Sequence, residues 1–158
     1  MKRVFDMTRV TVDDLVHITE IEFLKSRYCR AIDNKEWDRL PELFTSDASF
    51  EGFGGGVINA VPEFVGRIVR LLNDSVTVHQ LHHHEIKIIG TGRASGVWSM
   101  TDYNEWPAAG KFRDVPEAIG FCGYGFYEER YCRDEGGWRI ERMRLTRIRF
   151  DYLIRSKR

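Results

Sequence analysis

Residues 76–106 read VTVHQLHHHEIKIIGTGRASGVWSMTDYNEW, and this stretch differs in character from everything before it. It is rich in the β-branched and aromatic residues that favour strands, and Gly90 and Gly92 mark a place where the chain can reverse. The pattern recurs twice further along, again with glycines in the connection. We therefore predict an antiparallel meander of four long strands, at 76–89, 93–106, 119–133 and 137–152.

The residues before this stretch have helical periodicity instead. Their apolar side chains recur at helical spacing, which predicts helices at 13–32, 36–44 and 61–73. Thr11 or Asp13 can cap the start of the first helix, and Pro62 stands in the first turn of the third. Residues 48–53 predict a short strand, and the glycines at 54–56 close it with a turn.

Helices followed by a meander indicate an α+β fold in which a strongly curved sheet wraps around the helices. The chain has 158 residues, which is the size of one ordinary domain. We assign residues 13–158 to that domain and residues 1–12 to a flexible N-terminal tail. The segment 107–118 carries proline and glycine, and we predict that it forms a loop acting as a lid or pocket rim.

The composition argues against several classes of function. The 24 basic and 24 acidic side chains cancel and are interspersed, so nucleic acid and anionic membranes are not expected partners. No apolar run approaches the roughly 20 residues of a membrane span, and the charged N-terminus lacks the core of a signal peptide. We therefore expect a cytoplasmic protein. The three cysteines have no disulfide or zinc spacing and are expected to be reduced thiols.

Asp33 is the first candidate for a chemical role, because it stands where the first predicted helix ends. The helix dipole disfavours a carboxylate at that place. A buried carboxylate there could serve as a base or as the partner of a cation. The alternative is that Asp33 or Asn34 caps the following helix, with Glu36 completing a capping box, and spacing alone favours this alternative.

Four of the five histidines lie within residues 79–84. Because alternate residues of a strand share a face, His79, Leu81 and His83 are predicted to form one set. His82 and His84 form the other set. Two histidines at this spacing could bind zinc if a third ligand came from elsewhere, and the alternative is a solvated, histidine-rich strand end.

Arg147 and Tyr28 are candidates because of where their predicted elements place them. Arg147 has the same strand parity as Met143 and Leu145, and an arginine in phase with apolar residues requires a carboxylate, a ligand or solvent. Tyr28 lies on the apolar stripe of the first helix. There a core residue with a hydrogen-bonded hydroxyl is a more common interpretation than a catalytic acid.

Four segments together resemble a known superfamily. YCRAIDNKEWDRLPELFTSDASF at 28–50 resembles the opening helices and first strand of SnoaL-like proteins of the nuclear-transport-factor-2-like superfamily. The later strands resemble it in VHQLHHHEIKI (78–88), RASGVWSMTDY (93–103) and GFYEERYCRDEGGWRIERMRLTRI (125–148). The similarity is to the group of scytalone dehydratase, hexachlorocyclohexane dehydrochlorinase and bile-acid 7α-dehydratase. It implies a cone-shaped, cystatin-like α+β fold with three N-terminal helices packed on a strongly curved antiparallel sheet.

The same resemblance implies roles for individual residues. Asp33 matches the catalytic Asp that closes the first helix, and His79 matches the catalytic His, with His82 as a secondary candidate. Tyr28 and Arg147 match a Tyr and an Arg of the bile-acid dehydratase. The second catalytic His of scytalone dehydratase has no counterpart in this sequence, which argues against scytalone itself as the substrate.

By this resemblance we expect a cofactor-independent lyase, a dehydratase acting on a cyclic or polycyclic ketone. Asp33 would orient His79, which would remove a proton beside a carbonyl and return it to the departing hydroxyl. Tyr28 or Arg147 would donate to the enolate oxygen, and neither a metal nor an organic cofactor is expected. The alternatives are a non-catalytic ligand-binding or structural module, a ketosteroid-isomerase-type isomerase or cyclase, and a histidine-cluster metalloprotein.

Large apolar side chains suggest a large, flat, apolar substrate, although core packing uses the same residue types. The candidates for substrate binding are His82, Trp98, Met100, Phe121, Tyr124 and Phe126. Oligomers are usual among the proteins that the chain resembles. We therefore expect a homo-oligomer, either a trimer or a dimer.

Overall fold

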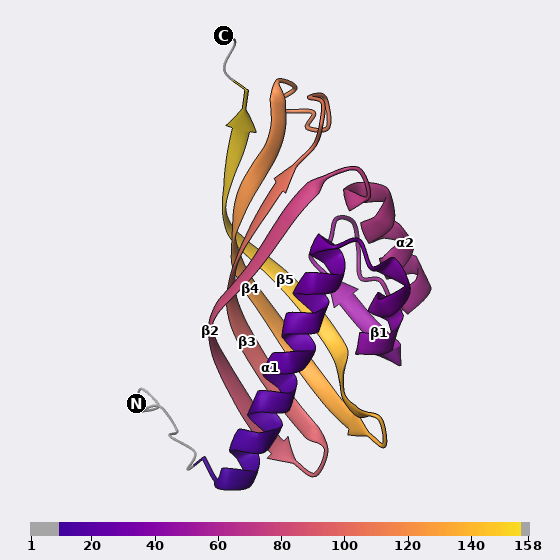
Figure 1. The fold of residues 1–158 in the computed structure, drawn as a ribbon, viewed down its shortest axis with the longest axis vertical. Helices are drawn as coiled ribbons and strands as arrows, with labels where there is room; N and C mark the ends of the chain where they lie inside the picture. The colour runs from indigo at the N-terminus through magenta and orange to yellow at the C-terminus, as the bar shows by residue number, and fades with distance from the viewer. Residues whose placement is uncertain (1–9, 156–158) are drawn as a thin grey trace.

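The structure is a computed structural model and describes residues 10–155. Its elements are α1 (Val12–Asp33), the 3-10 helix η1 (Trp37–Leu43), β1 (Phe44–Glu51), α2 (Val61–Leu72), β2 (Val76–Gly90), β3 (Arg93–Glu105), β4 (Ala118–Asp134) and β5 (Gly137–Ile154). Figure 1 shows α1 lying along one face of the long strands, with β1 and α2 beside its carboxyl-terminal end. The α+β class and the four long strands are confirmed, each strand to within two residues.

The first helix begins where a capping box can form. The Thr11 hydroxyl accepts a hydrogen bond from the Asp14 amide at 3.1 Å, and the Asp14 carboxylate accepts one from the Thr11 amide at 2.8 Å. Of the two predicted caps, Thr11 is therefore the one used. Most of the predicted tail, residues 1–9, lies outside the described residues.

The prediction of three N-terminal α-helices needs correction. The middle element is a 3-10 helix, and Pro41 lies inside it. Proline lacks an amide donor and clashes with the preceding turn of an α-helix, which favours a short, tight segment at this place. The chain then enters β1 at Phe44, earlier than the predicted start at residue 48, and the predicted place of this strand between the second and third helices is confirmed.

The sheet is mixed, whereas an antiparallel one was predicted. Its order is β1-β5-β4-β3-β2, and the four long strands pair antiparallel. β1 lies parallel to β5, with Phe44 opposite Ile140 and Phe50 opposite Met143. These two strands are not joined by a hairpin, so no turn in the sequence indicates their direction.

The core lies between the helices and the inner face of the sheet. At its β1 end the Phe50 and Phe64 rings stack at 3.8 Å, and Phe44 contacts both edge-on. At the other end Phe112, from the predicted loop, packs edge-on against Trp106 and Phe121. Phe64 fixes α2 against β1, and Tyr28 fixes α1 against Phe44 and Tyr127, which positions the residues at the end of α1.

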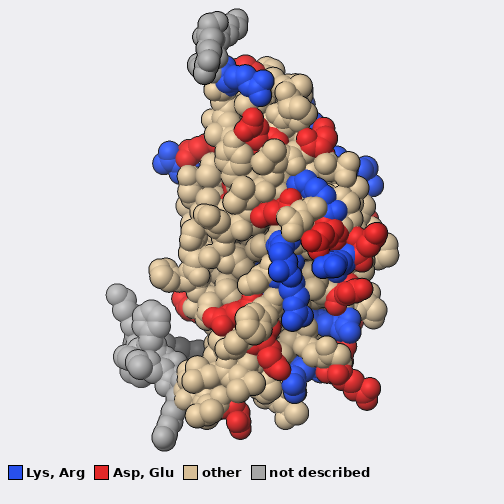
Figure 2. All heavy atoms as spheres, in the orientation of Figure 1, with Lys and Arg blue, Asp and Glu red and all other residues tan. Residues whose placement is uncertain are grey.

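The described surface mixes charges of both signs on the face drawn in Figure 2. Within the described part of the chain, no helix combines the length and hydropathy needed to cross a membrane. The cytoplasmic location stays a prediction.

Candidate active site

The end of α1 meets the start of β2, and this contact brings Asp33 to His79. Asp33 Oδ1 lies 2.7 Å from His79 Nδ1, and the Asp33 carboxylate also accepts the His79 amide at 2.8 Å. The Thr77 hydroxyl donates to the same carboxylate at 2.9 Å. A neutral His79 with its proton on Nδ1 would complete these bonds and present Nε2 as a base.

Local backbone geometry explains why Asp33 is available for this contact. α1 stops in a Schellman motif, in which the Lys35 amide donates to Ile32 and the Glu36 amide to Ala31. Lys35 takes the left-handed conformation, with φ of 61°. Glu36 is the N-cap of η1 and makes no side-chain cap bond. The structure thus places Asp33 against His79 and does not use it as a cap.

Lys35 and Thr77 extend the contact between Asp33 and His79 and were missed by the sequence analysis. Lys35 Nζ donates to Thr77 Oγ1 at 2.8 Å, and Thr77 in turn donates to Asp33. Burial lowers the pKa of Lys35, while the Asp33 charge opposes that shift. Thr77 has the strand parity of His79, and this parity is the signal that could have found it.

A pocket between α1 and β2 exposes this pair to ligands. Its cavity volume is about 450 Å³, and it is lined by Ser26, Cys29, Arg30, Asp33, Asn34, His79 and Leu81. The side chain of His79 is only 6% exposed, whereas that of Asp33 is 24% exposed. No described residue hydrogen bonds to His79 Nε2, so this nitrogen can exchange a proton with a bound molecule. We call this the α1–β2 pocket.

Arg147 has the carboxylate that its strand parity required. Its two terminal nitrogens bind both oxygens of the buried Asp102, and Nη2 lies 2.6 Å from Oδ2. The guanidinium also lies over the rings of Phe121 and Phe150. Asp102 stands opposite His79 in the pairing of β2 with β3. Asp102 was not predicted from the sequence, although a carboxylate in phase with buried residues is the same signal that identified Arg147.

Tyr28 lies in the core, with its ring edge-on to Phe44 and Tyr127. Burial raises the pKa of Tyr28 well above its ordinary value, and a hydrogen bond with Tyr127 opposes the shift. Tyr28 is therefore a neutral donor at physiological pH. The positive charge of Arg147 lowers the pKa of Tyr127, against the larger effect of burial, and the negative charge of Asp102 raises the pKa of Tyr28. These four groups therefore share one buried environment.

The histidine run does not form one cluster. A bulge between Leu81 and His84 adds a residue to β2 relative to β3, and the side-chain alternation changes there. His84, and not His83, therefore shares the inner face with His79, which corrects the predicted alternation. His84 Nε2 lies 2.7 Å from Glu22, and within residues 10–155 no group of three metal-binding side chains is placed to hold an ion.

The predicted substrate-binding residues divide between the two faces of the sheet. The buried ones on the inner face are Trp98, Met100 and Phe121. Tyr124 and Phe126 are 37% and 36% exposed and face outward, because the inward parity of β4 belongs to Tyr127. His82 also faces outward and binds Thr101 at 2.9 Å. In the described structure none of the six lines the α1–β2 pocket.

Gly123 leaves the space through which Arg147 reaches Asp102. A Cβ on Gly123 would collide with the Arg147 guanidinium and the Asp102 carboxylate. Gly123→Ala is therefore expected to separate the ion pair and to cost about 1–3 kcal/mol in the free energy of unfolding, measured by urea denaturation. Gly56→Ala is the matched control, because a Cβ there meets nothing within 4 Å. Equal stabilities of the two variants would contradict the role of Gly123.

The buried thiol of Cys29 is expected to make the free energy of unfolding fall as the pH becomes alkaline. Burial raises the pKa of its thiol from 9.0 to about 11. The stabilising contribution is therefore complete below pH 9 and is lost as the pH rises towards 11. When the pH is raised from 9 to 11, the free energy of unfolding of the unmodified chain should fall by about 2–3 kcal/mol more than that of Cys29→Ala, as measured by urea denaturation. Cys132→Ala is the control, and a pH profile of Cys29→Ala identical to that of Cys132→Ala would refute the expectation.

Comparisons with known proteins agree with this architecture. A family model described as SnoaL-like domain matches residues 13–144. The uncharacterized protein Rv2910c of Mycobacterium tuberculosis is 29% identical over 144 residues, 90% of this chain and 92% of that protein.

Two solved structures are also similar. A candidate scytalone dehydratase of Novosphingobium aromaticivorans has a TM-score of 0.74 at 19% identity, covering 92% of this chain and 95% of its own. A hexachlorocyclohexane dehydrochlorinase, LinA-type3 from Novosphingobium barchaimii, has a TM-score of 0.72 at 16% identity, covering 90% and 93%. At these identities the two structures establish a shared fold.

Proposed function

Because the chain belongs to the SnoaL-like domain family, we propose that it is a cofactor-independent lyase. The reaction is the elimination of water, or of another small leaving group, from a cyclic or polycyclic ketone. The observation that carries the proposal is the 2.7 Å contact between Asp33 and His79 at the wall of a pocket. The similar folds of a candidate dehydratase and a dehydrochlorinase support the same reaction class.

In the proposed mechanism His79 Nε2 takes a proton from the carbon beside the ketone carbonyl. Asp33 accepts the Nδ1 proton in a hydrogen bond and stabilises the imidazolium that forms. The electron pair of the broken C–H bond forms the enolate. When the enolate collapses, a carbon–carbon double bond forms and the C–O bond breaks. His79 returns its proton to the departing oxygen, which leaves as water.

The enolate oxygen needs a donor, and Arg147 and Tyr28 are the two proposed ones. Among the described residues Arg147 has no acceptor for its N–H groups beyond the two bound to Asp102, and its side chain is 23% exposed. Tyr28 is held neutral by burial and is not among the residues that line the α1–β2 pocket, so its hydroxyl could donate only to a substrate that reaches into the core. A preorganised donor of this kind lowers the barrier to enolate formation.

The test separates proton removal from elimination. A panel of hydroxylated cyclic ketones is incubated with the protein in D₂O, and NMR follows exchange at the carbon beside the carbonyl together with formation of the unsaturated ketone. We expect both, and we expect both to be lost in His79→Ala. Exchange without elimination would indicate the isomerase or cyclase chemistry instead. Activity that His79→Ala retains would contradict the proposal.

The homo-oligomer, a trimer or a dimer, remains a proposal as well. The exposed aromatic side chains of Tyr124 and Phe126 on the outer face of the sheet offer an apolar surface for it. Light scattering coupled to size-exclusion chromatography would measure the mass. A monomer at micromolar concentration would refute the proposal.

A further inference from the structure

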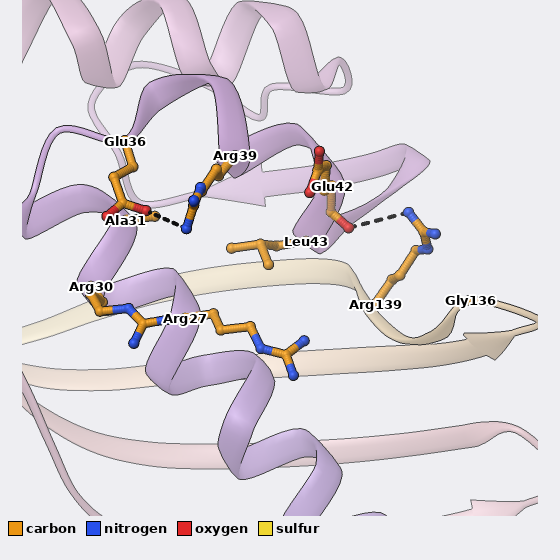
Figure 3. A pocket seen from close by; sticks show the side chains of 9 residues that line it. All are labelled: Arg27, Arg30, Ala31, Glu36, Arg39, Glu42, Leu43, Gly136 and Arg139. Carbon is orange, nitrogen blue, oxygen red and sulfur yellow. Dashed lines mark hydrogen bonds and ion pairs between the residues drawn. The ribbon is translucent and has the colours of Figure 1, made fainter.

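A second pocket borders α1 and is lined mainly by charged side chains. It lies between α1, η1 and the start of β5, as Figure 3 shows, and its cavity volume is about 410 Å³. Four of its nine lining residues are arginines: Arg27, Arg30, Arg39 and Arg139. Glu36 and Glu42 are the acidic members, and the small residues Ala31 and Gly136 leave room between the charges. We call it the arginine pocket.

The two carboxylates do not neutralise the four guanidinium groups. Glu36 pairs with Arg39 at 3.0 Å. Arg139 donates to the backbone oxygen of Glu42 at 3.2 Å and pairs with Asp134 outside the pocket. Within residues 10–155, Arg27 and Arg30 have no carboxylate at ion-pair distance. Arg27 and Arg30, both on α1, are therefore the two guanidinium groups of the lining that have no acidic partner among the described residues.

Such an arrangement is unfavourable for the protein alone. Arg27 and Arg30 stand three residues apart on the same helix face, where like charges destabilise a helix by a few tenths of a kcal/mol. Both border one hollow with two further guanidinium groups, as Figure 3 shows. An anion in the hollow would remove this repulsion and supply acceptors for donors that lack an acidic partner.

We propose that the arginine pocket binds the phosphate group of a ligand. The two guanidinium groups without an acidic partner, Arg27 and Arg30, match a phosphate monoester or diphosphate, each of which carries about two negative charges or more at neutral pH. The planar guanidinium presents paired N–H donors that fit phosphate oxygens two at a time. The cavity of about 410 Å³ lies within the size range of small-molecule sites, which leaves space for more than a single phosphate.

The proposed site is distinct from the Asp33–His79 pair, although Arg30 lines both pockets. Arg27 borders the arginine pocket and is not among the residues of the α1–β2 pocket. Substitution of Arg27 therefore tests the phosphate site alone. The proposal does not depend on the lyase reaction, because binding can be measured without turnover.

The experiment is isothermal titration calorimetry of the full chain with inorganic phosphate and with pyrophosphate, at constant ionic strength, which gives the dissociation constant of each anion. We expect both anions to bind, and we expect Arg27→Gln and Arg30→Gln each to raise the dissociation constant by about tenfold, the effect of losing one charge-assisted contact. Arg27→Lys keeps the charge, and its dissociation constant should lie between those of Arg27→Gln and the unmodified chain. Tighter binding of pyrophosphate would identify a diphosphate ligand, and equal binding a phosphate monoester.

Two control variants make the result decisive. Arg113→Gln removes an exposed arginine of the β3–β4 connection and should leave binding unchanged. His79→Ala should also bind both anions normally, so a failure of the lyase proposal would not affect this one. Absence of binding to the unmodified chain would overturn the site. An equal loss of affinity in Arg113→Gln and Arg27→Gln would overturn it too, because it would show general charge attraction only.

Discussion

Asp33→Asn and His79→Ala are each expected to lower kcat by about 10²–10⁴-fold with the fold intact, the range that a positioned acid or base contributes. His79→Ala removes the only ring in the α1–β2 pocket that could carry the proton, as far as the described residues go. Asp33→Asn keeps the shape of the side chain but removes the charge that would stabilise a protonated His79. Initial rates on a ketone identified by the D₂O experiment would measure both losses.

Control variants separate catalysis from folding in this experiment. His82→Ala removes a histidine of the same run that faces outward and binds Thr101, so its kcat should be unchanged. Near-ultraviolet circular dichroism of Asp33→Asn should match the unmodified chain, because asparagine can still accept the His79 amide at one oxygen. Retention of most activity by either Asp33→Asn or His79→Ala would refute the catalytic pair.

Local patterns in the sequence carried most of the fold. Apolar residues at strand and helix spacing are visible over short windows, and they located the four long strands and the ends of α1. The direction of β1 was not predictable in this way. Its pairing with β5 joins Phe44 to Ile140, almost a hundred residues apart, and no turn between them reports the direction. The direction of such a pairing depends on the tertiary packing of the strand and the helices, which short windows of sequence do not report.

A residue of the candidate site could be predicted when its own position in a strand gave the signal. It could not be predicted when a β-bulge changed the alternation or when the partner came from a distant part of the sequence. Because Arg147 is in phase with apolar residues, the sequence predicted that it needs a carboxylate partner. The alternation of β3 could have identified Asp102 as that partner. The alternation around His83 and His84 failed because a bulge has no marker such as glycine here. Asp33 had two interpretations that spacing could not separate, since its partner comes from another element.

Lys25→Met is expected to lower the free energy of unfolding by about 3–5 kcal/mol, because it leaves the Glu129 carboxylate buried without its cation. Lys25 Nζ lies 2.6 Å from Glu129, and both side chains are 0% exposed. The ammonium also lies 4.3 Å from the ring centres of Tyr28 and Tyr127. In the sequence the two charged residues look like ordinary surface residues, and only the fold brings them together. Urea unfolding at neutral pH measures the loss.

A second substitution shows whether buried charge causes that loss. Lys25→Met combined with Glu129→Gln removes both charges of this pair, and glutamine can still accept the Tyr131 hydroxyl that now donates to Glu129. The double variant should therefore be more stable than Lys25→Met, and with Glu129→Gln as the other single variant a double-mutant cycle gives the interaction energy of the pair. Arg142→Ala breaks an exposed contact with Glu51 and should change stability by no more than about 0.5 kcal/mol. If Lys25→Met costs no more than this control, or if the double variant is less stable than Lys25→Met, then removal of the cation is not what destabilises the core.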